Sequence, residues 1–102
     1  MKDLMRIKCL ISQDIETLLN QQIKKEAHSS SLYLSMASWC NQNGYDYSAD
    51  YFTKQSEEER MHQLKLFKYV LDMGGNAISP EVTGIKTDFA GFREVFAKQK
   101  FG

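Results

Sequence analysis

The stretch SQDIETLLNQQIKKEAHSSSLYLSMASWCNQNG, residues 12–44, is predicted to form one long helix. Ser12 suits the N-cap position, and the acids Asp14 and Glu16 suit the positive end of the helix dipole. The pair Asn43-Gly44 supplies the stop, because glycine readily adopts the left-handed conformation that ends a helix. A helix of about 30 residues is well above the usual length in globular proteins. The chain is therefore organised around long helices.

A second helical run begins at Asp46 or Ser48, continues through YFTKQSEEERMHQLKLFKYVLDM and ends at Gly74-Gly75. Two long helices joined by a tight glycine turn form an antiparallel hairpin. Residues 74–87 are irregular and contain the only proline, and residues 88–100 resume helical spacing. The phenylalanines that set this last spacing are Phe89, Phe92 and Phe96. The prediction is an all-α fold.

Each long helix carries an apolar stripe at helical spacing. The first stripe consists of Leu19, Ile23, Ser30, Tyr33 and Ala37, and the second of Phe52, Leu66, Tyr69 or Val70, and Met73. A hairpin alone leaves much of this surface in water, so further helices are needed to cover it.

The composition indicates one small domain without a strongly charged partner. Of the 102 residues, 42% are hydrophobic and 25% are charged, and 13 basic residues balance 13 acidic ones. No net field attracts nucleic acid or an anionic membrane, and no apolar run approaches the roughly 20 residues that span a bilayer. We divide the chain into an N-terminal extension, 1–11, and a helical domain, 12–102. The extension lacks the features of a signal peptide. The widely spaced Cys9 and Cys40 indicate a reducing compartment, and we expect the cytoplasm.

Three ionisable residues interrupt the apolar stripes, at positions where burial is expected. Glu26 lies in the first stripe, seven residues before Tyr33, and Glu59 and His62 lie in the second. A buried carboxylate without a partner is costly, and a bound cation removes that cost. Residues three apart share a helix face, so Glu59 and His62 can reach one ion together, and Glu26 can close the site from the facing helix. Carboxylate with imidazole suits iron or manganese, and the lack of a nearby thiolate argues against structural zinc.

Each of these residues, and several neighbours, also has an ordinary structural interpretation. Glu57 and Glu58 fit a solvated helix face, and His28 fits the surface. Tyr33 fits a core position, and Glu26 fits an acid paired with Lys24 or Lys25. Only the combination of Glu26, Glu59 and His62 on facing stripes favours a metal site.

The stretches QQIKKEAHSSSLYLSMASWC and KQSEEERMHQLKLFKYV closely resemble the first two helices of bacterial non-haem ferritins. The resemblance covers residues 12–100 and implies that Glu26, Glu59 and His62 are iron ligands. It places Tyr33 beside the site and Glu58 at an accessory third iron site. It further implies oxidation of Fe(II) by O₂ at a di-iron centre, followed by storage of ferric mineral in a hollow cage.

One departure from that family concerns the second half of its bundle. In ferritins the third and fourth helices supply further ligands, and residue 102 is reached before any such ligand. We expect a ferritin-like hairpin, half of a four-helix bundle, completed by another chain. Di-iron carboxylate bundles generally use one Glu from each of two helices and a Glu-x-x-His from each of the other two. Two copies about a two-fold axis, as a homodimer or within a larger assembly, would supply that set.

Three alternatives to iron handling follow from the same residues. The first is that the chain is an inactive truncated ferritin. The second is that it is a non-catalytic helical module that binds a partner through its apolar stripe. A DNA-binding mini-ferritin is the third, and the balanced charge disfavours it.

Overall fold

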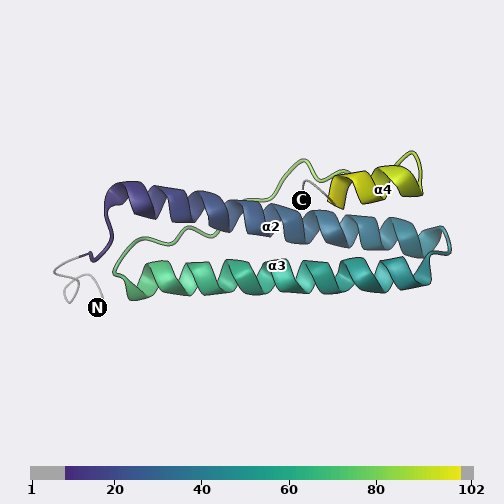
Figure 1. The fold of residues 1–102 in the computed structure, drawn as a ribbon. Coiled ribbons are helices and arrows are strands. Elements are labelled where there is room, and N and C mark those ends of the chain that lie inside the picture. The colour runs from purple at the N-terminus through teal and green to yellow at the C-terminus, as the bar shows by residue number, and fades with distance from the viewer. Residues whose placement is uncertain (1–8, 100–102) are drawn as a thin grey trace.

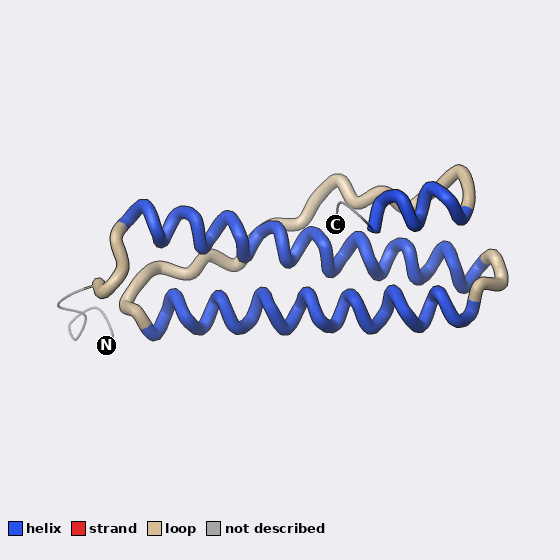
Figure 2. The backbone as a smooth tube through the Cα atoms, in the orientation of Figure 1, coloured by secondary structure: helices blue, strands red, loops and turns tan. Residues whose placement is uncertain are grey.

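The computed structural model describes residues 9–99, in which three helices and no strand occur (Figure 1). Helix α2 spans Gln13–Gln42, α3 spans Asp46–Asp72 and α4 spans Phe92–Gln99. Helices α2 and α3 lie antiparallel along their whole lengths, and the chain measures 55 × 20 × 18 Å (Figure 2). The all-α prediction is confirmed. Most of the predicted N-terminal extension and the last three residues lie outside the described range.

The ends of the hairpin helices follow the local signals. The Ser12 hydroxyl accepts a hydrogen bond from the Ile15 N–H at 3.2 Å, which satisfies one of the open donors of the first turn. Gly44 adopts a φ of 83°, the left-handed conformation that turns the chain into α3. Helix α3 starts at Asp46, the earlier of its two predicted starts.

The third helix is shorter than the predicted segment 88–100, because it begins only at Phe92. The residues before it are held by side-chain contacts that cannot be predicted from the helical spacing of the sequence. The Glu94 carboxylate accepts the Ala90 N–H at 3.1 Å and forms an ion pair with Lys86. Phe89 therefore lies before α4, where its ring packs edge-on against Trp39 at 6.3 Å.

The core occupies the end of the hairpin that α4 covers. It contains Tyr33, Met36, Ala37 and Cys40 from α2, Ala49 and Phe52 from α3, and Phe89 and Val95 from the segment around α4. Helix α4 lies against α2, and its Phe96 side chain reaches α3, where the ring centroids of Phe96 and Phe52 are 5.6 Å apart. Toward the other end, Val70 is fully buried whereas Tyr69 is 46% exposed, which decides between the two predicted stripe residues.

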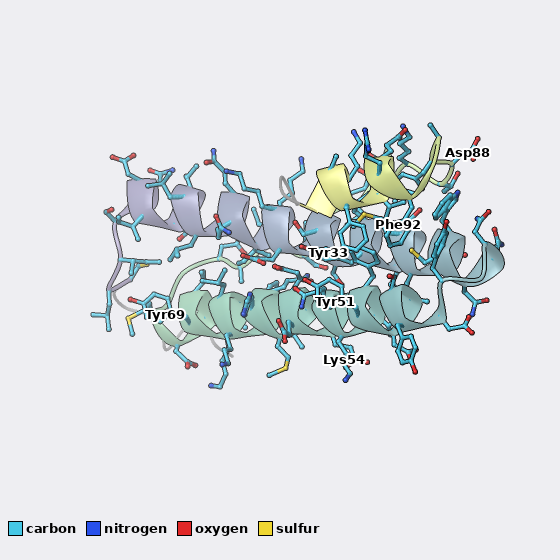
Figure 3. All side chains as sticks on the ribbon, turned by 45° about the vertical axis from the view of Figure 1, so that its right-hand side comes forward. Tyr33, Tyr51, Lys54, Tyr69, Asp88 and Phe92 are labelled. Atoms are coloured by element: carbon cyan, nitrogen blue, oxygen red, sulfur yellow. The ribbon has the colours of Figure 1, made fainter. Side chains whose placement is uncertain are left out.

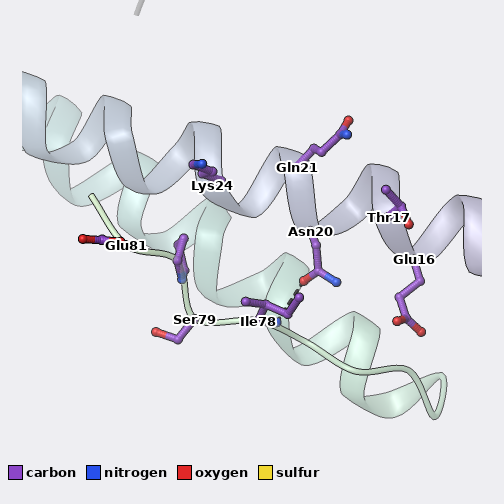
Figure 4. A pocket seen from close by; sticks show the side chains of 9 residues that line it. Glu16, Thr17, Asn20, Gln21, Lys24, Ile78, Ser79 and Glu81 are labelled. Carbon is purple, nitrogen blue, oxygen red and sulfur yellow. Dashed lines mark hydrogen bonds between the residues drawn. The ribbon is translucent and has the colours of Figure 1, made fainter. Parts of the chain in front are cut away.

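The segment between α3 and α4, residues 73–91, is called the crossover segment. It returns along the outer side of α2 and is held there by Asn20 (Figure 4). The Asn20 amide donates to the Asn76 carbonyl at 2.9 Å, and its oxygen accepts the Ile78 N–H at 2.9 Å. The segment then leads into α4, which lies beside α2 on the side away from α3 (Figure 3). Within residues 9–99, no helix has the length and apolar character needed to cross a membrane.

Candidate metal centre

The three predicted ligands meet between α2 and α3. Nδ1 of His62 lies 3.6 Å from Oε2 of Glu26 and 3.7 Å from Oε2 of Glu59. One ligand atom from each of the three residues lies within 4.8 Å of the others. Atoms that bind one ion at about 2.0–2.2 Å are at most about 4.4 Å apart. Small side-chain rotations therefore suffice to place all three atoms around a single ion.

The two carboxylates are more enclosed than the imidazole. The side chains of Glu26 and Glu59 are 15% and 20% exposed, whereas that of His62 is 55% exposed. The apolar stripe predicted burial for His62 as well, and this prediction is wrong. His62 lies at the margin of the stripe, one turn beyond Glu59, where no described helix covers α3. The site is consequently open on the side of the imidazole.

The opening is a hollow of about 370 Å³, lined by Gln22, Glu26, His62, Lys65 and Leu66. Gln22 donates a hydrogen bond from Nε2 to Oε1 of Glu26 at 2.8 Å. The predicted alternative partners of Glu26, Lys24 and Lys25, are exposed. Gln22 was not identified from the sequence, although a glutamine four residues before an acid has the spacing for such a bond.

A pair of serines sets the register of the two ligand-bearing helices. The Ser30 hydroxyl lies 2.9 Å from the Ser56 carbonyl, and the Ser56 hydroxyl lies 2.7 Å from the Ser30 carbonyl. Their small side chains allow α2 and α3 to approach closely at this level. Ser30 follows Glu26 by one turn, and Ser56 precedes Glu59 by three residues. This pair of hydrogen bonds therefore holds the predicted ligands opposite one another.

Tyr33 is buried beside this region, with 6% of its surface exposed, and its ring lies 6.0 Å from that of Phe52. Figure 3 shows Tyr33 on α2 close to Tyr51 on the facing α3. Burial is the main cause that raises the pKa of the Tyr33 phenol. Smaller electrostatic contributions come from Tyr51, Glu26 and Glu58. The phenol therefore keeps its proton well into the alkaline range, so at neutral pH it can donate a hydrogen bond.

Other residues singled out in the sequence do not join the cluster. Glu57, Glu58 and His28 are exposed, and the ligand cluster among the described residues contains only Glu26, Glu59 and His62. Glu58 nevertheless acts electrostatically on Tyr33. The buried Cys40 belongs to the core, and no cysteine is present in the cluster. The donor set of two carboxylates and one imidazole fits Fe(II) or Mn(II).

A second hollow of about 370 Å³ lies on the outer side of α2, beneath the crossover segment (Figure 4). It is lined by Glu16, Thr17, Asn20, Gln21, Lys24, Ile78, Ser79, Pro80 and Glu81. This hollow holds none of the predicted ligands, so we assign the candidate site to the carboxylate cluster.

The fold and the site together define an all-α protein with a long antiparallel helix pair whose facing sides carry carboxylate and imidazole groups. The chain belongs to the ferritin family, because the ferritin-like domain matches residues 16–100. It is 31% identical over 87 residues to a bacterial non-heme ferritin of Staphylococcus epidermidis, a match that covers 85% of this chain and 52% of that protein.

Solved structures give the same result. The ferritin of Chlorobium tepidum superposes with a TM-score of 0.82 at 33% identity, covering 86% of this chain and 54% of that one. An open pore ferritin from Archaeoglobus fulgidus superposes with a TM-score of 0.82 at 32% identity, with the same coverage. The chain thus spans about half the length of the relatives it matches. The predicted ferritin-like fold, with a hairpin that corresponds to about half of such chains, is confirmed.

Proposed function

We propose that this protein binds iron in the manner of a ferritin, with Glu26, Glu59 and His62 as ligands. The observation that carries the proposal is the convergence of three ligand atoms, from two helices, within 4.8 Å. Two largely enclosed carboxylates without a cation would repel each other, and a divalent ion removes that repulsion. The names of the relatives support iron storage as the purpose of that binding.

We extend the proposal to Fe(II) oxidation once a second half-site is supplied by another chain. A di-iron centre lets two Fe(II) ions give up one electron each, and O₂ takes both electrons with two protons to form hydrogen peroxide. Carboxylates stabilise the Fe(III) that results. Tyr33 would act as a hydrogen-bond or redox partner, and Glu58 as an accessory iron ligand. The two free thiols, Cys9 and Cys40, are consistent with a cytoplasmic location.

The first test measures metal binding through stability. Binding to the folded state alone stabilises it by about 2.7 kcal/mol at a hundredfold excess over the dissociation constant. We expect anaerobic Fe(II) to raise the melting temperature of the wild type and of Glu57→Ala, whose carboxylate is exposed and outside the cluster. We expect no such rise for Glu59→Ala. An equal rise in all three proteins would show that iron binds elsewhere.

Oxidation requires its own measurement, with an oxygen electrode after Fe(II) addition. The wild type should consume O₂ faster than buffer alone, and Glu59→Ala should lose that increment, whereas Glu57→Ala should keep it. A Glu59→Ala protein that oxidises Fe(II) as fast as the wild type would contradict the assigned site.

One observation favours the alternative of a partner-binding helical module. Exposed apolar side chains continue along the face that carries the site, with Ile15 45%, Leu18 60% and Tyr69 46% exposed. Such a face fits the docking of further helices whether or not iron is bound. A protein that associates equally with and without Fe(II), and consumes no O₂, would support this second function.

A further inference from the structure

Gln22 lies one helical turn before Glu26 and contacts its carboxylate directly. We propose that Gln22 is a positioning residue, which holds Glu26 so that only one of its oxygens faces the metal and which thereby favours Mn(II) and Fe(II) over larger cations. The inference rests on the proposed metal site, and it assigns a task to a residue that coordinates nothing itself.

The two oxygens of Glu26 have different surroundings. Oε1 accepts the hydrogen bond from Nε2 of Gln22 at 2.8 Å. Oε2 lies 3.6 Å from Nδ1 of His62, on the side where the ligand atoms converge. An ion placed among those atoms therefore meets Oε2. Binding through both oxygens would compete with the Gln22 hydrogen bond.

The position of Gln22 suits this task. It lines the same hollow as Glu26 and His62, so its amide reaches the carboxylate from the open side of the site. The amide is neutral, so it orients Glu26 without competing for the cation by charge. Residues that hydrogen-bond to metal ligands fix ligand orientation, and their removal typically lowers metal affinity by about 10–100-fold.

The number of oxygens that Glu26 offers affects which cation fits. Ca²⁺ accepts six to eight oxygens at about 2.3–2.6 Å, and it commonly takes both oxygens of a carboxylate. Smaller transition-metal ions use fewer and shorter bonds, together with imidazole. A Glu26 carboxylate freed from Gln22 can turn both oxygens toward the site. Loss of Gln22 should therefore weaken Mn(II) binding without weakening Ca²⁺ binding.

The test compares Gln22→Met with Gln21→Met, a matched control. Gln21 is the same residue type in the next position, but it lines the hollow on the outer side of α2. Mn(II) binding is followed by loss of the free-ion paramagnetic resonance signal, and Ca²⁺ binding by its displacement of Mn(II). We expect Gln22→Met to bind Mn(II) about tenfold more weakly. Its preference for Mn(II) over Ca²⁺ should fall by at least the same factor, and Gln21→Met should match the wild type.

Two results would overturn the inference. One is an unchanged Mn(II) affinity in Gln22→Met. The other is an equal loss of Mn(II) and Ca²⁺ binding, which a merely structural role would produce. Such a structural role would also lower the melting temperature of the metal-free Gln22→Met variant. Failure of the proposed function itself is distinguishable, because Glu59→Ala would then bind Mn(II) as tightly as the wild type.

Discussion

Two glycines at the ends of the hairpin helices are required for different reasons. A Cβ at Gly75 would lie 3.0 Å from Cγ1 of the fully buried Val70 and 3.3 Å from Cδ1 of Ile11. At Gly44 a Cβ would meet nothing within 4 Å, but the φ of 83° is unfavourable for other residues. Gly75 is therefore needed for space, and Gly44 for backbone conformation.

We expect Gly75→Ala and Gly44→Ala each to lower the free energy of unfolding by about 1–3 kcal/mol, from overpacking and from backbone strain respectively. The free energies of unfolding are measured by urea denaturation, and two further variants separate overpacking from backbone strain. Adding Val70→Ala should partly offset the cost of Gly75→Ala in a double-mutant cycle, and Gly44→Asn should be milder than Gly44→Ala because asparagine tolerates the left-handed region. Strictly additive effects of Gly75→Ala and Val70→Ala would contradict the steric account.

At the same scale, the spacing of the sequence predicted the ligand cluster but not its surroundings. Glu26, Glu59 and His62 were predicted because helical periodicity alone places them on facing stripes, and the structure does bring them together. The exposure of His62 was not predicted, since it depends on which helices cover α3. Gln22 was missed because a side-chain hydrogen bond on a helix leaves only a weak spacing signal.

Among the helices, α4 is held in position by contacts of residues that lie outside the helix itself. Its segment is tied to α2 by the Ser35 hydroxyl, which donates to the Lys86 carbonyl. The Lys86 ammonium lies 5.7 Å from the centre of the Phe89 ring and pairs with Glu94. The bounds of α2 and α3 were predicted because caps and glycines are local signals. The start of α4 was not predicted, because it depends on Lys86, which lies in a segment without helical periodicity.

This arrangement predicts acid sensitivity of α4. The hydrogen bond from Lys86, followed by that from the Ala90 N–H, lowers the pKa of Glu94 below its ordinary value of 4.5. Because the folded pKa lies below that of the unfolded chain, the pair stabilises the docked helix above pH 4.5. That contribution is lost as the pH falls through the folded value. Trp39 is the single tryptophan and contacts Phe89, so its fluorescence reports on this docking.

We expect Trp39 emission of the wild type to change below pH 4.5. In Lys86→Met the change should already be present at pH 7, and the response to acid should be smaller. The control is Lys68→Met, which removes an exposed ion pair with Asp72 on α3, and it should titrate like the wild type. Identical titrations of Lys86→Met and the wild type would show that the Lys86–Glu94 pair does not hold α4.

For the whole molecule, the position of α4 determines how a second copy can complete the site. The hairpin carries one Glu and one Glu-x-x-His pair, and di-iron bundles of this kind use two of each. Two copies share a site only if their hairpins overlap around Glu26 and Glu59. In such an arrangement we expect a partner helix to cover the side of α2 on which α4 lies, where Phe96 contacts Phe52. We therefore expect a shared-site dimer to require that α4 leave its place on α2.

We therefore expect Mn(II) to double the solution mass measured by light scattering, because four facing carboxylates repel until cations neutralise them. Trp39 emission should change in the same range of Mn(II) concentration. Leu18→Lys on the uncovered face should prevent the doubling. Leu34→Lys should not, since it is 53% exposed and lies about 160° around α2 from Leu18. If the mass doubles while Trp39 emission stays constant, α4 has kept its place, and the two copies associate without merging their half-sites.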